Sequence, residues 1–142
     1  MGKLKEPFYL AAAEEYAKRL RAFADFKLVE LPESRLPENP SPAEIAQGLS
    51  REAAAIQEHV PKGAWLCVFT PEGRERSSEE LAGRLAAVKG SGKSAAAFVI
   101  GSSFGIDPSV KQAADERLSV SRMARRNFSC SCFCAVTSML MP

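Results

Sequence analysis

The segment that most constrains the fold of this chain is an unbroken apolar stretch that runs into a glycine-bounded turn. Ala95–Ile100 is entirely apolar and is followed by the turn Gly101–Gly105. Asp107 and Pro108 then mark a helix start, and a short second strand is expected over Leu118–Met123. A buried strand, a turn, a helix and a second strand form the ligand-cradling unit of an open α/β sheet.

Capping signals predict the other helices. Pro7 begins a helical stretch with apolar residues on one face. Ser41 precedes a proline and is followed three residues later by Glu44, which is the pattern of a capping box, and Ser77–Glu80 repeats that pattern. Each start is followed by apolar residues at helical spacing, so we expect two further amphipathic helices there.

Short apolar runs alternate with these helices. Phe26–Leu31 and Trp65–Phe69 are predicted strands, whereas Pro32–Pro42 contains four prolines and is expected to be a loop. Strands that alternate with helices predict a parallel sheet covered by helices on both faces. With 142 residues, no internal repeat and no long linker, the chain is expected to form a single α/β domain.

Composition narrows the classes of function only slightly. The net charge of +2 neither indicates nor excludes a nucleic-acid partner. The sequence has no apolar stretch of the roughly 20 residues that a membrane span needs, and residues 1–6 have no apolar signal-peptide core. We therefore expect a cytoplasmic protein with no membrane partner and with reduced cysteines, of which Cys67 lies in an apolar run.

Few side chains stand out as candidates for chemistry. Glu72 follows a predicted strand, where either a functional carboxylate or an ordinary solvated one fits. Gly101 and Gly105 either let a ligand approach the backbone or simply form a tight turn. His59 is the only histidine and is expected at the surface, so no Ser/His/Asp set can form, and no zinc-ligand spacing is present.

Several segments taken together nevertheless resemble one family. They fall in its order from Gly2 to Met123: Gly2-Lys3-Leu4-Lys5-Glu6, Tyr16-Ala17-Lys18-Arg19-Leu20, Glu30-Leu31-Pro32, Glu72-Gly73 with Ser77-Ser78-Glu79-Glu80, Ala97-Phe98-Val99-Ile100-Gly101-Ser102-Ser103-Phe104-Gly105, and Ala114-Asp115 with Leu118-Ser119-Val120-Ser121-Arg122-Met123. Singly these segments are weak signals, but jointly they are specific. The chain resembles the ribosomal RNA large-subunit methyltransferase H family of the SPOUT class.

The resemblance implies a SPOUT-like α/β fold with a C-terminal trefoil knot, a rare exception to the rule that chains are unknotted. It also implies a homodimer that methylates N3 of a pseudouridine in the large-subunit (23S) rRNA of the ribosome, with S-adenosylmethionine as cofactor and no metal. The catalytic residues are not identified. The cofactor-binding positions carried over from the family are Phe69, Gly101, Val120, Ser121, Arg122 and Met123.

The chain departs from the family after Met123. The family has Thr, an apolar residue and Pro-His there, then a long helix and a Pro-Tyr-His tail, whereas residues 129–142 here contain no charge, Tyr or His. We interpret residues 1–123 as an incomplete methyltransferase domain and 124–142 as a divergent, poorly ordered tail produced by a shift of reading frame. The family's first strand, which precedes Gly2, is also missing, so exposed ladder groups are expected on its neighbours.

Two other functions stay open. The first is a non-catalytic remnant of the fold that binds RNA through basic residues, namely Lys3, Lys5, Lys89, Lys93, Arg122, Arg125 and Arg126. The second is a metal or redox protein built on the alternating cysteines Cys130, Cys132 and Cys134. No turn flanks those cysteines to form a preorganised pocket, so the sequence favours a disordered or misfolded tail over a metal site.

Overall fold

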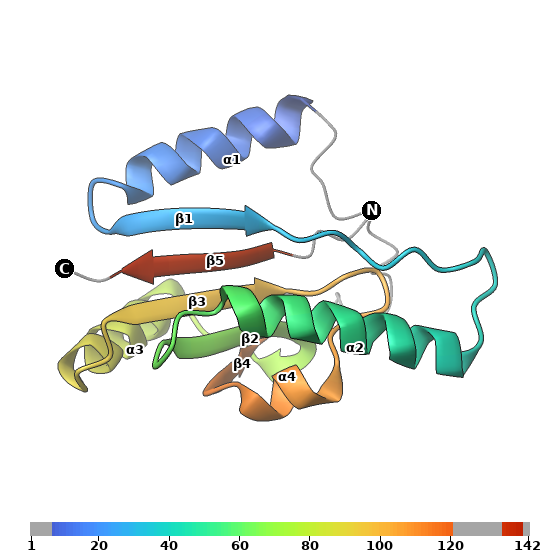
Figure 1. Cartoon of the computed structure of the whole chain (residues 1–142). Helices are drawn as coiled ribbons and strands as arrows, with labels where there is room; N and C mark the ends of the chain where they lie inside the picture. Colours follow the sequence, from blue (N-terminus) through green and yellow to red (C-terminus); the bar gives the residue numbers. More distant parts are fainter. Residues whose placement is uncertain (1–6, 121–134, 141–142) are drawn as a thin grey trace.

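The computed structural model describes residues 7–120 and the backbone of residues 135–140 (Figure 1). Helices and strands alternate along most of the chain, as the sequence predicts. Their order is α1 (Pro7–Leu20), β1 (Asp25–Glu30), α2 (Pro42–His59), β2 (Trp65–Arg74), α3 (Ser78–Gly90), β3 (Ala95–Ile100), α4 (Pro108–Ala113), β4 (Glu116–Leu118) and β5 (Ala135–Leu140).

The five strands form one sheet in the order β1-β5-β3-β2-β4. Strands β3, β2 and β4 are parallel to one another, which confirms the parallel α/β sheet predicted from the sequence. Strand β5 runs antiparallel between β1 and β3, so the sheet is not parallel throughout. The helix α1 lies along β1 at the edge of the sheet (Figure 1).

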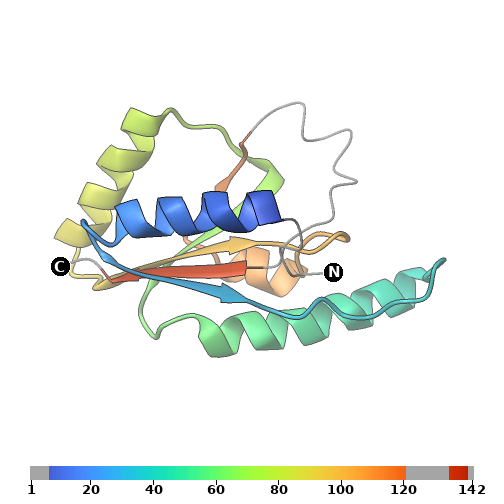
Figure 2. The same cartoon turned by 90° about the horizontal axis from the view of Figure 1, so that it is seen from above.

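Helices cover both faces of the sheet, as predicted (Figure 2). Alternate residues of β2 explain the two apolar layers. Leu66 and Val68 pack with Ile56 of α2 and Val110 of α4 on one face. On the other face the layer is formed by Trp65, Cys67 and Leu118 with Val88 of α3. A strand buried on both sides reads as a continuous apolar run, which is why Trp65–Phe69 shows no alternation.

The predicted capping boxes are present. The Ser41 hydroxyl accepts from the backbone N–H of Glu44 at 3.3 Å, and the Glu44 carboxylate accepts from the Ser41 backbone N–H at 2.8 Å. Ser77 and Glu80 form the same pair of bonds at the start of α3. These bonds satisfy backbone donors that a helix start leaves unpaired, so both helices begin where the sequence predicts.

The proline-rich loop after β1 lies along α2. Glu52, which is 7% exposed, accepts from the backbone N–H of Ser34 at 2.8 Å. The Ser34 hydroxyl donates to the carbonyl of Gly48 at 2.9 Å. A loop that lacks regular structure must still pair its buried polar groups, and here α2 supplies the partners.

Strands β2 and β4 differ from the sequence prediction by more than one residue, whereas β1 is shifted by only one. Strand β2 continues past Phe69 to Arg74, with an irregularity between those two residues. Strand β4 covers only Glu116–Leu118, so the strand expected over Leu118–Met123 begins earlier and ends at Leu118. The cause is pairing, because Leu118 pairs with both Phe69 and Arg74 of β2.

The divergent tail contributes β5. Residues 135–140 pair with β1 on one side and with β3 on the other over all six positions. The ladder groups of β1 and β3 that face each other across β5 are therefore paired with it. The C-terminal knot expected for the family stays a prediction, because residues 121–134 lie outside the described residues.

Candidate functional site

The carboxyl ends of the three parallel strands meet at one edge of the sheet. Phe69 of β2 pairs with Ile100 of β3 and with Leu118 of β4. The register therefore places Gly101, directly after Ile100, and Val120, two residues after Leu118, on either side of Phe69, where the regular ladder of β2 stops. Such an edge is where open α/β sheets bind their ligands.

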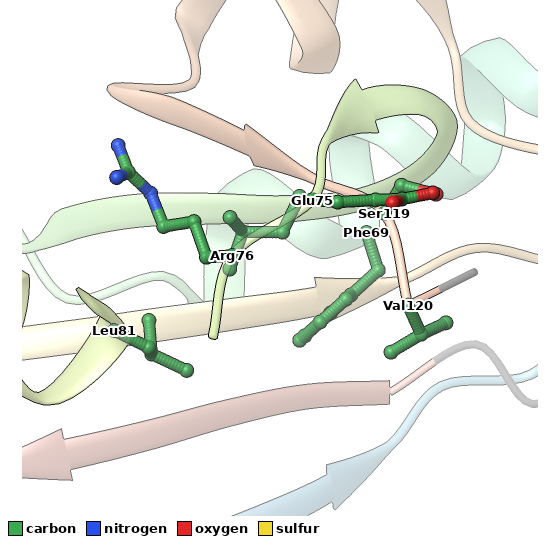
Figure 3. A pocket seen from close by; sticks show the side chains of 7 residues that line it. Phe69, Glu75, Arg76, Leu81, Ser119 and Val120 are labelled. Atoms are coloured by element: carbon green, nitrogen blue, oxygen red, sulfur yellow. The ribbon is translucent and has the colours of Figure 1, made fainter. Parts of the chain in front are cut away.

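A pocket of about 440 Å³ opens beside this edge, on the face covered by α3 (Figure 3). Its lining combines apolar and charged side chains and consists of Phe69, Glu75, Arg76, Leu81, Leu118, Ser119 and Val120. Two of the predicted cofactor residues, Phe69 and Val120, thus line the same pocket. Its volume falls in the range of roughly 300–1,000 Å³ that is usual for small-molecule sites.

Aromatic packing supports the floor of the pocket. The ring of Phe69 stacks on Phe98 with 6.2 Å between ring centroids, and Phe98 in turn meets Trp65 edge-to-face at 5.9 Å. Figure 3 shows the Phe69 side chain between those of Leu81 and Val120. Val120 is 76% exposed, so this side of the pocket is open to solvent in the described part of the chain.

Gly101 does not line the pocket. A Cβ atom on it would lie 2.3 Å from Cγ1 of Ile106 and 2.5 Å from the carbonyl oxygen of Gly105. The turn closes through two backbone hydrogen bonds between Ser102 and Gly105, and Gly105 has a φ of +98°. The glycine is thus required by the turn itself, whereas the sequence analysis also explained it by room for a cofactor.

Ser121, Arg122 and Met123 lie outside the described residues, and their expected role as cofactor contacts stays a prediction. Glu75, Arg76 and Ser119 line the pocket but are not predicted as site residues from the sequence. Their signal was weak, because a charged pair just before the helix cap at Ser77 is typical of any solvated loop. Leu81 was expected on the buried face of α3 and does pack against the apolar layer there.

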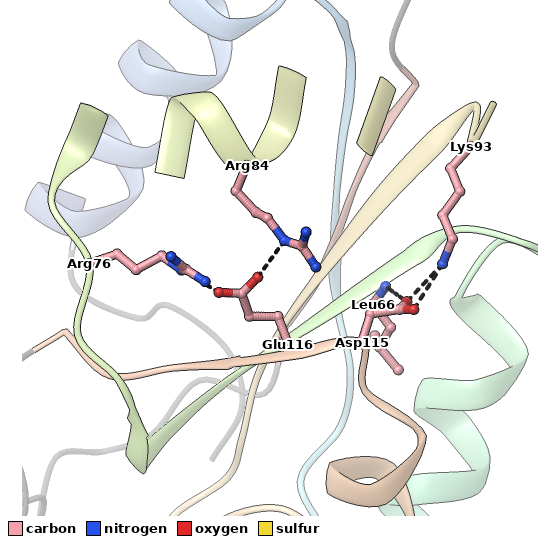
Figure 4. Close-up of polar contacts among 6 residues, drawn as sticks. All are labelled: Leu66, Arg76, Arg84, Lys93, Asp115 and Glu116. Atoms are coloured by element: carbon pink, nitrogen blue, oxygen red, sulfur yellow. Dashed lines mark hydrogen bonds and ion pairs between the residues drawn. The ribbon is translucent and has the colours of Figure 1, made fainter. Parts of the chain in front are cut away.

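Behind the pocket, one carboxylate lies between two arginines (Figure 4). Glu116 accepts from Nε of Arg76 with one oxygen and from Nε of Arg84, at 3.0 Å, with the other. The Glu116 side chain is only 8% exposed. Burial of a carboxylate is tolerated when it is paired and hydrogen-bonded, and here both oxygens have a cationic partner.

The neighbouring carboxylate, Asp115, is hydrogen-bonded to the start of strand β2 and to a lysine (Figure 4). Asp115 accepts from the backbone N–H of Leu66 at 2.8 Å and pairs with Lys93 at 2.9 Å. Burial alone raises the pKa of Asp115, but the hydrogen bonds from Leu66 and Lys93 outweigh it and lower that pKa below its ordinary value. This pair is structural, since it lies at the amino end of β2, away from the pocket.

Three residues considered in the sequence analysis are not part of the pocket. Glu72 pairs with Lys111 of α4 at 2.6 Å, and the hydrogen bond from Lys111 lowers the pKa of Glu72. His59 is exposed, with Nδ1 lying 2.8 Å from the carbonyl of Ala55. Burial raises the pKa of the Cys67 thiol to about 12, so it is inert at neutral pH.

The pocket suits a molecule with an apolar body and a charged end. Phe69, Leu81 and Val120 offer apolar surface, while Glu75 and Arg76 offer charge of both signs. S-adenosylmethionine, with a nucleoside and an amino-acid end, matches this lining. The described residues include no cluster of three side chains that could ligate a metal, and Cys130, Cys132 and Cys134 lie outside them. Among the helices described, none is long and apolar enough to cross a membrane.

Comparison with known proteins identifies the family of the chain. The sequence pattern of the family described as predicted SPOUT methyltransferase matches residues 1–126. The ribosomal RNA large subunit methyltransferase H of Moorella thermoacetica is 41% identical over 122 residues, which cover 86% of this chain and 76% of that protein. The protein of the same name from Listeria monocytogenes is 38% identical over 123 residues, 87% of this chain and 77% of the relative. The chain therefore belongs to the SPOUT methyltransferase family.

Proposed function

We propose that this chain is an S-adenosylmethionine-dependent methyltransferase that modifies N3 of a pseudouridine in large-subunit ribosomal RNA, with reduced activity. The observation that carries the proposal is the meeting of Phe69 and Val120 in one pocket at the carboxyl edge of the parallel strands. The relatives named above are rRNA methyltransferases, which supports rRNA as the substrate of this chain.

Different residues of the pocket would bind different parts of the methyl donor. Phe69, Leu81 and Val120 would hold the nucleoside part of the methyl donor by apolar contact. Backbone groups along residues 120–123 would complete the recognition, whereas Gly101 would contribute by allowing the tight turn after β3. A bound S-adenosylmethionine would supply the methyl group to N3, leaving as the demethylated sulfide, and the N3 proton would pass to an acceptor. Orientation carries much of such a reaction, because N3–H is weakly acidic.

The reduced activity follows from the sequence beyond the pocket. The family match ends at residue 126, and residues 124–142 lack the Pro-His pair and the charged helix of the family. In the family these parts help to close the cofactor site, form the knot and build the homodimer. We therefore propose a cytoplasmic protein that dimerises less stably than its relatives, which sedimentation velocity would measure.

The function is tested by methyl transfer to ribosomes that lack this modification, with the Listeria monocytogenes relative as a positive control. We expect slow incorporation of labelled methyl groups into large-subunit rRNA, at N3 of pseudouridine when the product is mapped. Incorporation as fast as that of the relative would contradict the reduced activity. Methylation of another base or position would overturn the proposed substrate.

A non-catalytic remnant of the fold is the second candidate. It is favoured by the open side of the pocket at Val120, which is 76% exposed. Titration calorimetry with S-adenosylmethionine separates the two candidates. Stoichiometric binding supports the enzyme, whereas no binding by a sample with a cooperative unfolding transition supports the remnant.

A further inference from the structure

The three-residue cluster behind the pocket contains more positive than negative charge. Glu116 contributes one carboxylate, and Arg76 and Arg84 contribute two guanidinium groups. Both carboxylate oxygens are already occupied by Nε atoms. Each guanidinium has four more N–H donors on its terminal nitrogens, so the cluster holds donors in excess of its own acceptors.

Only one of the two arginines reaches the pocket. Arg76 lines it and its side chain is 18% exposed, whereas Arg84 is 43% exposed and does not line it. Within the described chain, the hydrogen bonds of Arg76 use Nε alone. In Figure 3 the Arg76 guanidinium lies on the opposite side of the labelled residues from Val120. A partly buried, anchored arginine with free terminal donors is suited to bidentate binding of a carboxylate or a phosphate, and the adjoining pocket has the size of a small-molecule site.

We propose that Arg76 binds the carboxylate of the methyl donor's amino-acid end, and that Glu116 positions Arg76 for this contact. The inference rests on the proposed function, because it takes S-adenosylmethionine as the ligand. The nucleoside part would lie toward Phe69 and Val120, and the amino-acid end would lie toward Arg76. Glu116 fixes the guanidinium through Nε, which leaves the terminal nitrogens to form a bidentate pair with the ligand.

The test compares two ligands that differ only in this carboxylate, S-adenosylmethionine and its decarboxylated form. Their dissociation constants are measured by titration calorimetry for the wild type, Arg76→Gln, Glu116→Gln and Arg84→Gln. Arg84→Gln is the matched control, since Arg84 shares the same carboxylate but lies outside the pocket lining. The unfolding midpoint of each variant shows whether it is folded.

We expect Arg76→Gln to weaken S-adenosylmethionine binding at least about tenfold, since a hydrogen bond to a charged group is lost, and to leave the decarboxylated ligand almost unchanged. Glu116→Gln should weaken the same ligand by a smaller factor in the same selective way. Arg84→Gln should affect both ligands alike.

Two results would overturn the proposal while leaving the proposed function intact. The first is equal weakening of both ligands by Arg76→Gln in a folded variant. The second is unchanged binding of S-adenosylmethionine together with weaker binding to ribosomes, which would assign Arg76 to RNA phosphate. A folded wild-type chain that binds neither ligand would instead refute the proposed function, and this inference with it.

Discussion

Gly73 lies directly against the backbone of Leu118, so closely that a Cβ atom on the glycine would be 2.4 Å from the Leu118 carbonyl carbon. This approach lets the end of β2 return to β4 after the irregularity that follows Phe69. The backbone N–H of Ser119 then donates to the carbonyl of Arg74 at 3.0 Å. The contact between Gly73 and Leu118 therefore shapes the wall of the pocket that Leu118 and Ser119 form.

Gly73→Ala should destabilise the protein, because the added methyl group meets backbone atoms that cannot move aside cheaply. We expect a loss of about 1–3 kcal/mol in the free energy of unfolding, measured by urea denaturation. Gly83→Ala is the control, since a Cβ there meets nothing within 4 Å and Gly83 lies within α3. That change should stabilise the protein by about 0.5–1 kcal/mol. Equal effects at both positions would contradict the close approach.

Gly101→Ala tests which of two explanations accounts for this glycine. If the turn requires it, the added Cβ collides with Ile106 and Gly105 and the chain loses about 1–3 kcal/mol of stability without any ligand. If the cofactor alone requires it, stability is unchanged and only S-adenosylmethionine binding is lost. We expect the first result in thermal unfolding of the ligand-free protein.

The buried Glu52 should matter more for its acceptor oxygen than for its charge. Glu52→Ala leaves the backbone N–H of Ser34 without its partner, which should lower the free energy of unfolding by about 1–3 kcal/mol. Glu52→Gln keeps an acceptor of the same reach and should lose much less. Amide hydrogen exchange at Ser34 provides a local readout, with faster exchange expected only in the alanine variant.

Asp115 should stabilise the folded protein at neutral pH more than at acid pH. Its pKa is lowered in the folded protein, so its contribution is present above its unfolded pKa, about 3.9, and is lost as the pH falls through the folded value. Asp115→Asn should cost about 0.5–1 kcal/mol at neutral pH, a modest figure because the side chain is 38% exposed and the ion pair is screened.

The measurement for Asp115→Asn is urea denaturation of both proteins at a series of pH values. The difference in unfolding free energy should shrink below about pH 4 and disappear once Asp115 is protonated in both states. A difference that stays constant down to the acid limit of folding would show that the carboxylate charge plays no part.

Strand β5 should tolerate side-chain changes better than the loss of a backbone donor. Thr137→Pro removes an N–H from a strand that is paired on both sides, and the sheet should lose at least about 1 kcal/mol of stability. Thr137→Val keeps the backbone donor and serves as the control. A proline variant as stable as the control would show that β5 does not occupy the position between β1 and β3.

Local signals in the sequence predicted most of the fold. The caps Ser41 and Ser77 and the apolar run Ala95–Ile100 each determine an element through neighbours a few residues away, so the structure agrees with them closely. The sequence predicts that β2 ends at Phe69, whereas it ends at Arg74. The difference arises because the approach of Gly73 to Leu118 joins residues far apart in the sequence. Periodicity cannot detect such a contact.

The candidate site was predicted only in part for the same reason. Phe69 and Val120 were carried over by family resemblance, and the pocket does bring them together. The pairing of Arg76 with Glu116 spans 40 positions and leaves no local pattern in the sequence. Strand β5 was overlooked because its segment follows the departure from the family, although Val136 and Thr137 are typical strand residues.

The insertion of β5 between β1 and β3 has a consequence for the order of folding. Strands β2, β3 and β4 can pair as soon as residue 118 has emerged during translation. The ladder of β1 joins Asp25 to Leu140. Strand β1, and α1 beside it, can therefore join the sheet only after residues 135–140 have been synthesised. Closing so long a loop is entropically costly and slow, and the edge of β3 that β5 later covers stays unpaired during that interval.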